Sequence, residues 1–193
     1  MQALSRQSPP DRPERLTTLA AIEAAVWQQL GQAVRDPQHA WRVAVLATVN
    51  GNAADARCVV LRDLELAQRT LLIYTDPRSP KAQQVDAHPQ GVLVLWSEAL
   101  GWQLRLGVAL TLETSGLRVS SRWAQLKLTP AAHDYLSPLP PGTVIGAQPP
   151  QRESREYFAV LAAQVQSVDW LELHAQGHRR ARFDAAGAAW IAP

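Results

Sequence analysis

Two groups of side chains in the first half of the chain have the chemistry to hold an anion. Arg57 and Arg62 flank an apolar, strand-like run. A second apolar run is followed by four further polar residues, which are Thr75, Arg78, Ser79 and Lys81. The Ser79-Pro80 pair is typical of a helix start, with serine at the cap and proline in the first turn. Guanidinium groups, hydroxyls and a helix N-terminus together favour a bound phosphate.

The composition predicts one domain with a substantial core. Of 193 residues, 47% are hydrophobic and 19% are charged. No apolar run reaches the ~18 to 20 residues of a membrane helix. The net charge is +2, and because no run of five or more basic residues occurs, a nucleic-acid face remains only an alternative. The scattered histidines lack metal-ligand spacing, so no metal site is predicted.

A single cysteine, Cys58, rules out an intrachain disulfide, and this fits a reducing cytoplasm. Because Cys58 stands in a Val-rich run, we expect it to be a small core residue rather than a nucleophile.

The hydrophobic periodicity of the first half indicates one helix followed by hairpins. Residues 1–15 are polar and Pro-rich, and we expect a flexible leader. A helix is predicted from Thr17 or Thr18 to Gly31, because apolar residues recur at helical spacing. Three strands are then expected at 41–49, 56–61 and 70–75, with an Asn-Gly hairpin at 50–51 and a turn at 62–65.

The remaining elements complete a mainly β fold with peripheral helices (α+β). A short helix is predicted from Ser79 to about His88, and a longer one over 116–136 around Leu117, Trp123, Leu126 and Leu128. Further strands are expected at 91–96, 103–110, 157–173, 179–183 and 188–191. Alternation along the second of these strands places Gln103 and Arg105 on the same face. Consecutive hairpins predict an antiparallel sheet or barrel.

The motifs, taken in order, resemble the FMN-binding core of the pyridoxamine 5'-phosphate oxidase family. That family has Arg-x-Val-Leu-Leu-Lys, then Tyr-Thr, Ser-x-Lys, Asn-Pro, a Trp and Arg-Gln. The matching positions here are Arg57–Arg62, Tyr74-Thr75, Ser79–Lys81, Pro89, Trp96 and Gln103. The C-terminal segments 180–183 and 190–193 are loosely similar to the family's ending.

The resemblance implies a split β-barrel homodimer with FMN at the subunit interface, in a single domain spanning residues 16–193. Arg57 and Lys81 would hold the phosphate, assisted by Ser79. The flavin ring would be contacted by residues from several segments. These are Val60, Leu61, Tyr74, Thr75, Gln103 and, from the other subunit, Arg182. Arg62 completes the first motif and is counted with the cofactor-binding positions.

The chain also departs from the family pattern around the substrate. Arg62 stands where the family has a lysine near the substrate, and His178-Arg179-Arg180 replaces its Arg-Leu-His. Residues 123–146 lack the family's Tyr-Phe-x-x-Arg-Pro-x-x-Ser. We therefore expect an FMN-dependent oxidoreductase whose substrate is unknown, and we assign no catalytic residue. The alternatives are a true pyridoxamine 5'-phosphate oxidase and a non-catalytic carrier of flavin or haem.

Overall fold

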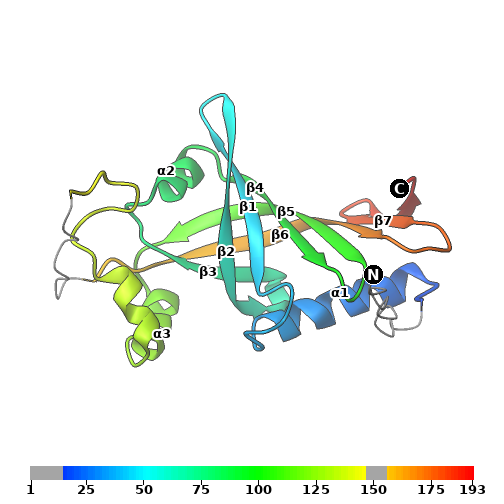
Figure 1. The fold of residues 1–193 in the computed structure, drawn as a ribbon, viewed down its shortest axis with the longest axis horizontal. Helices are drawn as coiled ribbons and strands as arrows, with labels where there is room; N and C mark the ends of the chain where they lie inside the picture. The colour runs from blue at the N-terminus through cyan, green and yellow to red at the C-terminus, as the bar shows by residue number, and fades with distance from the viewer. Residues whose placement is uncertain (1–14, 147–155) are drawn as a thin grey trace, which may run out of the picture.

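The computed structural model describes residues 15–146 and 156–193, which form mainly antiparallel strands (Figure 1). Most of the predicted leader lies outside the described residues, and its last residue, Arg15, donates hydrogen bonds to Glu172. The elements in chain order are α1 (Leu19–Ala33), β1 (Val43–Asn50), β2 (Ala53–Glu65), a 3₁₀ turn (Leu66–Gln68), β3 (Thr70–Thr75), α2 (Pro80–Ala87), β4 (Gln90–Ser97), β5 (Trp102–Glu113), α3 (Leu117–Leu126), a second 3₁₀ turn (Pro130–Tyr135), β6 (Ala159–Glu172), β7 (Arg179–Asp184) and β8 (Gly187–Ile191).

The strands form a barrel-like ring with a hairpin attached. The sheet order is β3-β2-β1-β4-β5-β6-β7-β8, and the ring closes because β3 also pairs with β6. β7 and β8 extend beyond the ring at the end of the molecule opposite α2 and α3 (Figure 1). The predicted class, mainly β with peripheral helices, is confirmed.

The first hairpin forms where the sequence predicts it. β1 and β2 pair continuously from Val43 with Val60 to Asn50 with Ala53. Gly51 has a φ of 59°, which glycine adopts without the steric cost of a Cβ. This register fixes which side chains of β2 face the interior.

Helix α1 covers part of the barrel core. Its N-terminus is capped by the Thr18 hydroxyl, which accepts a hydrogen bond from the Ala21 N–H. Four of its residues are fully buried and join the core formed by the inward-facing strand residues; they are Ile22, Val26, Leu30 and Ala33. The predicted helix is confirmed and continues two residues beyond Gly31.

A second apolar cluster lies between α3 and the outer face of β3 and β6. It contains Leu72, Val119, Leu126, Tyr135, Phe158, Val160 and Ala162. The predicted helix over 116–136 is interrupted after α3 and resumes as the 3₁₀ turn. Leu117 and Leu128, two of the apolar residues around which that helix was predicted, are 85% and 84% exposed.

Two further expectations about β2 are wrong. Residues 62–65 continue the strand instead of forming a turn, because their pairing with β3 resumes after a bulge between Leu61 and Asp63. Cys58 is exposed, since it lies on the outward-facing side of the strand with Val60.

The outer face of β1, β2 and β4 is apolar and is not covered by a helix among the described residues. Val43, Val45 and Val49 are 50%, 39% and 39% exposed, and Trp96 on β4 is 45% exposed. An antiparallel sheet with one solvated face normally carries polar residues there. No helix in the described part of the chain is long and apolar enough to cross a membrane.

Candidate functional site

The predicted phosphate cluster forms around the first turn of α2. β3 ends at Thr75, and Ser79 precedes the helix in an extended conformation, as a cap residue does. Thr75 and Ser79 are 3% and 1% exposed, and their hydroxyl oxygens lie 3.4 Å apart. The Ser79 hydroxyl makes no capping hydrogen bond to the helix. The first N–H groups of a helix lack intrahelical partners, so this end of α2 is suited to an anion.

Lys81 is a cationic side chain whose surroundings are suited to a negatively charged ligand. It is half-buried, and no hydrogen-bond or ion-pair partner for its ammonium group lies among residues 15–146 and 156–193. Desolvation by burial lowers the pKa of Lys81, and the positive charge of Arg57 lowers it further, against the opposing effect of Asp76. Two neighbouring cations, one of them unpaired, fit the phosphate of a nucleotide such as FMN.

Arg57 reaches the same place from β2, but its guanidinium is already engaged. One terminal nitrogen donates to the Leu46 carbonyl and the Thr48 hydroxyl. The other donates to the Gln84 side-chain carbonyl at 2.8 Å and forms an ion pair with Asp55 at 2.6 Å. The structure therefore brings Arg57 beside Lys81 within a polar network.

Three members of this network were not predicted from the sequence. Thr48 donates to Gln84, and the Gln84 amide donates to Asp55 at 2.8 Å. A signal did exist for two of them. Asp55 lies two residues before Arg57 and hence on the same strand face, while Gln84 is three residues after Lys81 and hence on the same helix face.

Arg78 does not belong to the phosphate cluster, contrary to the initial expectation. Its guanidinium binds both carboxylate oxygens of Asp76 and donates to the carbonyls of Ser137 and Pro138. It also lies 3.2 Å from the centre of the Tyr157 ring. Arg78 thus fastens the loop after the second 3₁₀ turn to the turn before α2.

Three of the six positions predicted to contact the flavin ring lie elsewhere, on the outer face of the sheet, whereas Thr75 lies in the phosphate cluster itself. Strand alternation and pairing place Val60 on this face of β2, Gln103 opposite Trp96 on β5, and Arg182 opposite Asp169 on β7. Arg182 is exposed and pairs with Asp184 at 2.9 Å. One chain therefore keeps these three ring positions and Arg57 on different faces of the sheet.

Leu61 differs from its predicted role in one respect. Its side chain is fully buried in the barrel core, so the apolar contact with a flavin expected from it is not available. Its main-chain N–H donates to the Arg42 carbonyl at 2.9 Å. Val60 is consequently the apolar side chain of this pair that faces outward.

Arg62 and Tyr74 stand at the border between the outer sheet face and the α3 cluster. The Arg62 guanidinium carbon is 5.8 Å from the centre of the Tyr74 ring. It also lies against the Tyr135 hydroxyl, which the sequence did not indicate. Burial raises the pKa of Tyr135 to about 12, and the Arg62 charge opposes this rise. The Arg62 guanidinium is therefore already in contact with two aromatic side chains.

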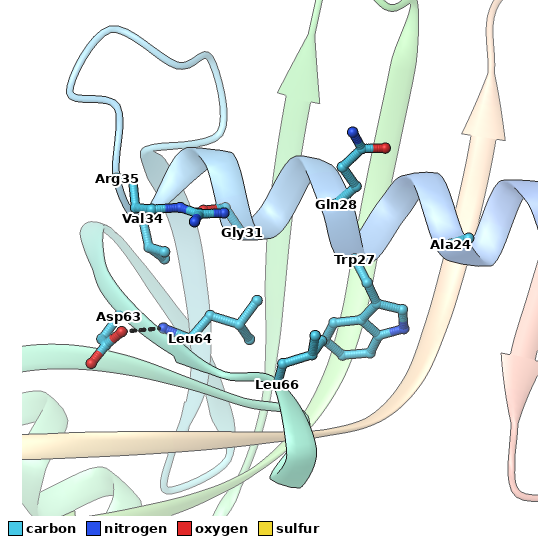
Figure 2. Close-up of a pocket in the computed structure, with 9 residues that line it drawn as sticks. All are labelled: Ala24, Trp27, Gln28, Gly31, Val34, Arg35, Asp63, Leu64 and Leu66. Carbon is cyan, nitrogen blue, oxygen red and sulfur yellow. Dashed lines mark hydrogen bonds between the residues drawn. The ribbon is translucent and has the colours of Figure 1, made fainter.

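A separate hollow of about 540 Å³ lies between α1 and the β2–β3 connection (Figure 2). Trp27 and Leu66 meet across it, and the side chain of Asp63 accepts a hydrogen bond from the Leu64 N–H at its edge (Figure 2). None of the predicted phosphate or ring positions lines it. Its walls are mainly apolar and lack the paired cations that a phosphate requires, so it is not the candidate site.

Part of the chain matches a known family of domains. Residues 24–112, from within α1 to near the end of β5, match the family model described as pyridoxamine 5'-phosphate oxidase, FMN-binding domain. The resemblance predicted from the motifs is thus confirmed for this part of the chain, and the matched domain is an FMN-binding one. A search of curated protein sequences gives no match.

Solved structures extend the likeness of fold to most of the chain. A pyridoxamine 5'-phosphate oxidase-related, FMN-binding protein from Nostoc punctiforme has a TM-score of 0.72 at 24% identity, covering 92% of this chain and 100% of that one. PhzG from Burkholderia lata, solved with tetrahydrophenazine-1-carboxylic acid, has a TM-score of 0.68 at 14% identity and covers 95% of both chains. An oxidase-like protein from Listeria innocua has a TM-score of 0.52 at 18% identity, covering 76% of this chain and 95% of that one. The predicted split-barrel fold is confirmed.

The lowered pKa of Lys81 can be tested directly. We expect its amine to lose a proton below the ordinary value of 10.5, because burial and Arg57 both disfavour the ammonium form. A bound phosphate favours the ammonium form, so added FMN should raise the pH at which half of the Lys81 amine is deprotonated. Trace acetylation across a pH series, quantified by peptide mass spectrometry, measures this, with exposed Lys127 as the internal control for reagent activity. A midpoint at or above 10.5 that FMN does not move would contradict the assignment.

Proposed function

We propose that this protein binds FMN with its phosphate between Lys81, Arg57 and the N-terminus of α2. The observation that carries the proposal is the half-buried, unpartnered Lys81 ammonium beside a second cation, within the described residues and within a segment that matches an FMN-binding domain. Thr75 and Ser79 supply hydroxyls at the same turn. Charge-assisted hydrogen bonds of this kind hold a phosphate firmly.

The flavin ring lies in this proposal against the outer sheet face near Val60. The face offers apolar strand residues together with Gln103, Arg182 and the Tyr74–Arg62 pair, which is the mixture of an apolar wall and a few polar groups that planar ligands need. When bound, FMN supplies hydride or electron transfer at its ring. The chain's own residues orient the ring and hold the phosphate charge.

The second part of the proposal is a homodimer formed through the outer face of β1, β2 and β4. Contiguous exposed apolar surface is uncommon on monomers and marks interfaces. Pairing two copies through this face would cover the valines and Trp96 and would bring Arg182 of one copy toward the flavin of the other. Such an arrangement would gather the outward-facing ring positions of both copies at one interface.

We further propose that the protein is a cytoplasmic oxidoreductase whose substrate is not pyridoxamine 5'-phosphate. The arginines of the altered C-terminal motif are already paired: Arg179 contacts Glu172 at 3.0 Å, and Arg180 binds both carboxylate oxygens of Asp169. Arg62 faces Tyr74 and Tyr135. These contacts leave those groups less able to clamp a substrate phosphate, which favours a different substrate.

Replacing either phosphate-binding cation should weaken the binding of FMN but not that of riboflavin. We expect Arg57→Ala and Lys81→Ala each to raise the Kd for FMN by about 10- to 100-fold, the cost of losing a charged hydrogen bond. Riboflavin, which lacks the phosphate, should bind almost as it does to the wild type. Fluorescence titration with both flavins measures this, and Lys127→Ala is the matched control. Unchanged FMN affinity in both variants would refute the phosphate assignment.

The proposed interface can be tested by placing a charge on it. We expect Val45→Glu to convert a dimer into a monomer, because a buried unpaired carboxylate is strongly unfavourable. Sedimentation velocity measures the change, and Val144→Glu, at a residue that is 96% exposed, should leave the dimer intact. A monomeric wild type, or a dimeric Val45→Glu variant, would contradict the interface.

Turnover separates an enzyme from a carrier. We expect reduced nicotinamide to bleach the flavin absorbance of the loaded protein under anaerobic conditions, and air to restore it. Adding pyridoxamine 5'-phosphate should yield neither aldehyde nor peroxide. Flavin that resists both NADH and NADPH would favour the carrier, whereas aldehyde formation would identify the true oxidase activity.

A further inference from the structure

The Arg57 guanidinium has almost no hydrogen-bonding capacity left for a phosphate. Each of its two terminal nitrogens carries two N–H groups. The first nitrogen uses both, on Leu46 and Thr48, and the second faces Gln84 and Asp55. The Nε–H is the fifth donor. Because bidentate recognition of a phosphate needs two parallel N–H groups, one of the present contacts must be given up when the phosphate binds.

Among these contacts, the one with Asp55 is the most readily exchanged for a phosphate. Thr48 and Gln84 are 3% and 7% exposed, and each is fixed by a hydrogen bond to the other. The Asp55 side chain is 40% exposed and can turn toward solvent. It is also the one anion bound to Arg57 among the described residues, so a phosphate replaces it without leaving the guanidinium unpaired.

We propose that Asp55 is an internal competitor that occupies Arg57 when the cofactor phosphate is absent and lowers the affinity for FMN. This inference rests on the proposed phosphate site. In the free protein, Asp55 compensates the charge of Arg57 beside Lys81, where two uncompensated cations would repel each other. On binding, the phosphate takes over the guanidinium, and the Asp55 carboxylate turns toward solvent.

The contacts of Asp55 keep it in the charged form that this competition requires. The hydrogen bond from Gln84 lowers the pKa of Asp55, and the Arg57 charge acts in the same direction, while desolvation opposes them. The carboxylate is therefore ionised at neutral pH. Its position directly opposite Thr48 in the β1–β2 register holds it next to Arg57.

The test is an Asp55→Asn variant, which removes the charge and retains an oxygen that can accept from Gln84. We expect the Kd for FMN to fall by roughly three- to tenfold, the range expected for releasing a partly exposed ion pair. The Kd for riboflavin should not change, because riboflavin has no phosphate. Fluorescence titration of the full-length variant with both flavins measures the two values.

Two further variants distinguish competition from a general charge effect. Asp86→Asn removes the same charge from an exposed position of α2 and should change the FMN affinity less than twofold, in keeping with the weakness of exposed charges. In the Arg57→Ala background, Asp55→Asn should no longer tighten FMN, because the group for which Asp55 competes is gone. This cycle isolates the coupling between Asp55 and Arg57.

The outcomes are separable. Weaker or unchanged FMN binding in Asp55→Asn, or equal tightening in Asp86→Asn, overturns the competition while leaving the proposed function in place. A wild type that binds no flavin, or wild-type affinity in both Arg57→Ala and Lys81→Ala, overturns the proposed function and this inference with it. Tightening confined to FMN and dependent on Arg57 establishes the inference.

Discussion

The candidate site depends on a small polar network that joins α2 to the first hairpin. Thr48 and Gln84 are buried, and a buried polar group must find a partner or cost free energy. They satisfy each other and both accept from Arg57, so the helix can sit on the sheet in few other positions. That docking places the N-terminus of α2, with Ser79 and Lys81, beside the guanidinium. The position of the proposed phosphate site therefore follows from how a helix and two strands satisfy their buried polar groups.

A second constraint is that β1, β2 and β4 carry apolar residues on both faces. The inner face fills the barrel core, and strand alternation then puts the remaining valines outside, together with Cys58 and Trp96. Gln103 and Arg182 lie on the same outer side. The outward-facing ring positions of two copies would come together if the copies met through this outer face. In the proposed function, the same outer sheet face thus supplies both the dimer interface and contacts to the flavin ring.

Much of this fold could be predicted from local pattern. The Asn50-Gly51 hairpin, the 70–75 strand and the helix after Ser79 follow from turn residues, a β-rich run and a proline suited to the first helical turn, which act over a few residues. The end of β2 could not be predicted in this way, because three of the residues 62–65 are charged and the segment forms a strand only through pairing with β3 past a bulge. Cys58 was misplaced for a similar reason: an apolar run does not show which of its faces will be covered.

For the candidate site, the sequence predicted several of the residues but not their ion-pair partners. The motif order located Arg57, Ser79 and Lys81, which the structure brings together. It did not show that Arg78 would be taken by Asp76, or that Asp55 would hold Arg57, because ion pairs depend on side-chain directions that spacing alone does not fix. Tyr135 was missed because it reaches Arg62 from a segment distant in sequence.

The central claim is that this chain carries FMN and recognises it by its phosphate. The most direct measurement is to purify the protein, release any bound flavin by denaturation and identify that flavin by mass. A second sample is first saturated with equal amounts of FMN and riboflavin, and the flavin that it retains is identified in the same way. We expect a yellow protein that releases FMN and that retains FMN over riboflavin in the competition. A protein that retains no flavin, or one that retains riboflavin equally well, would contradict the claim.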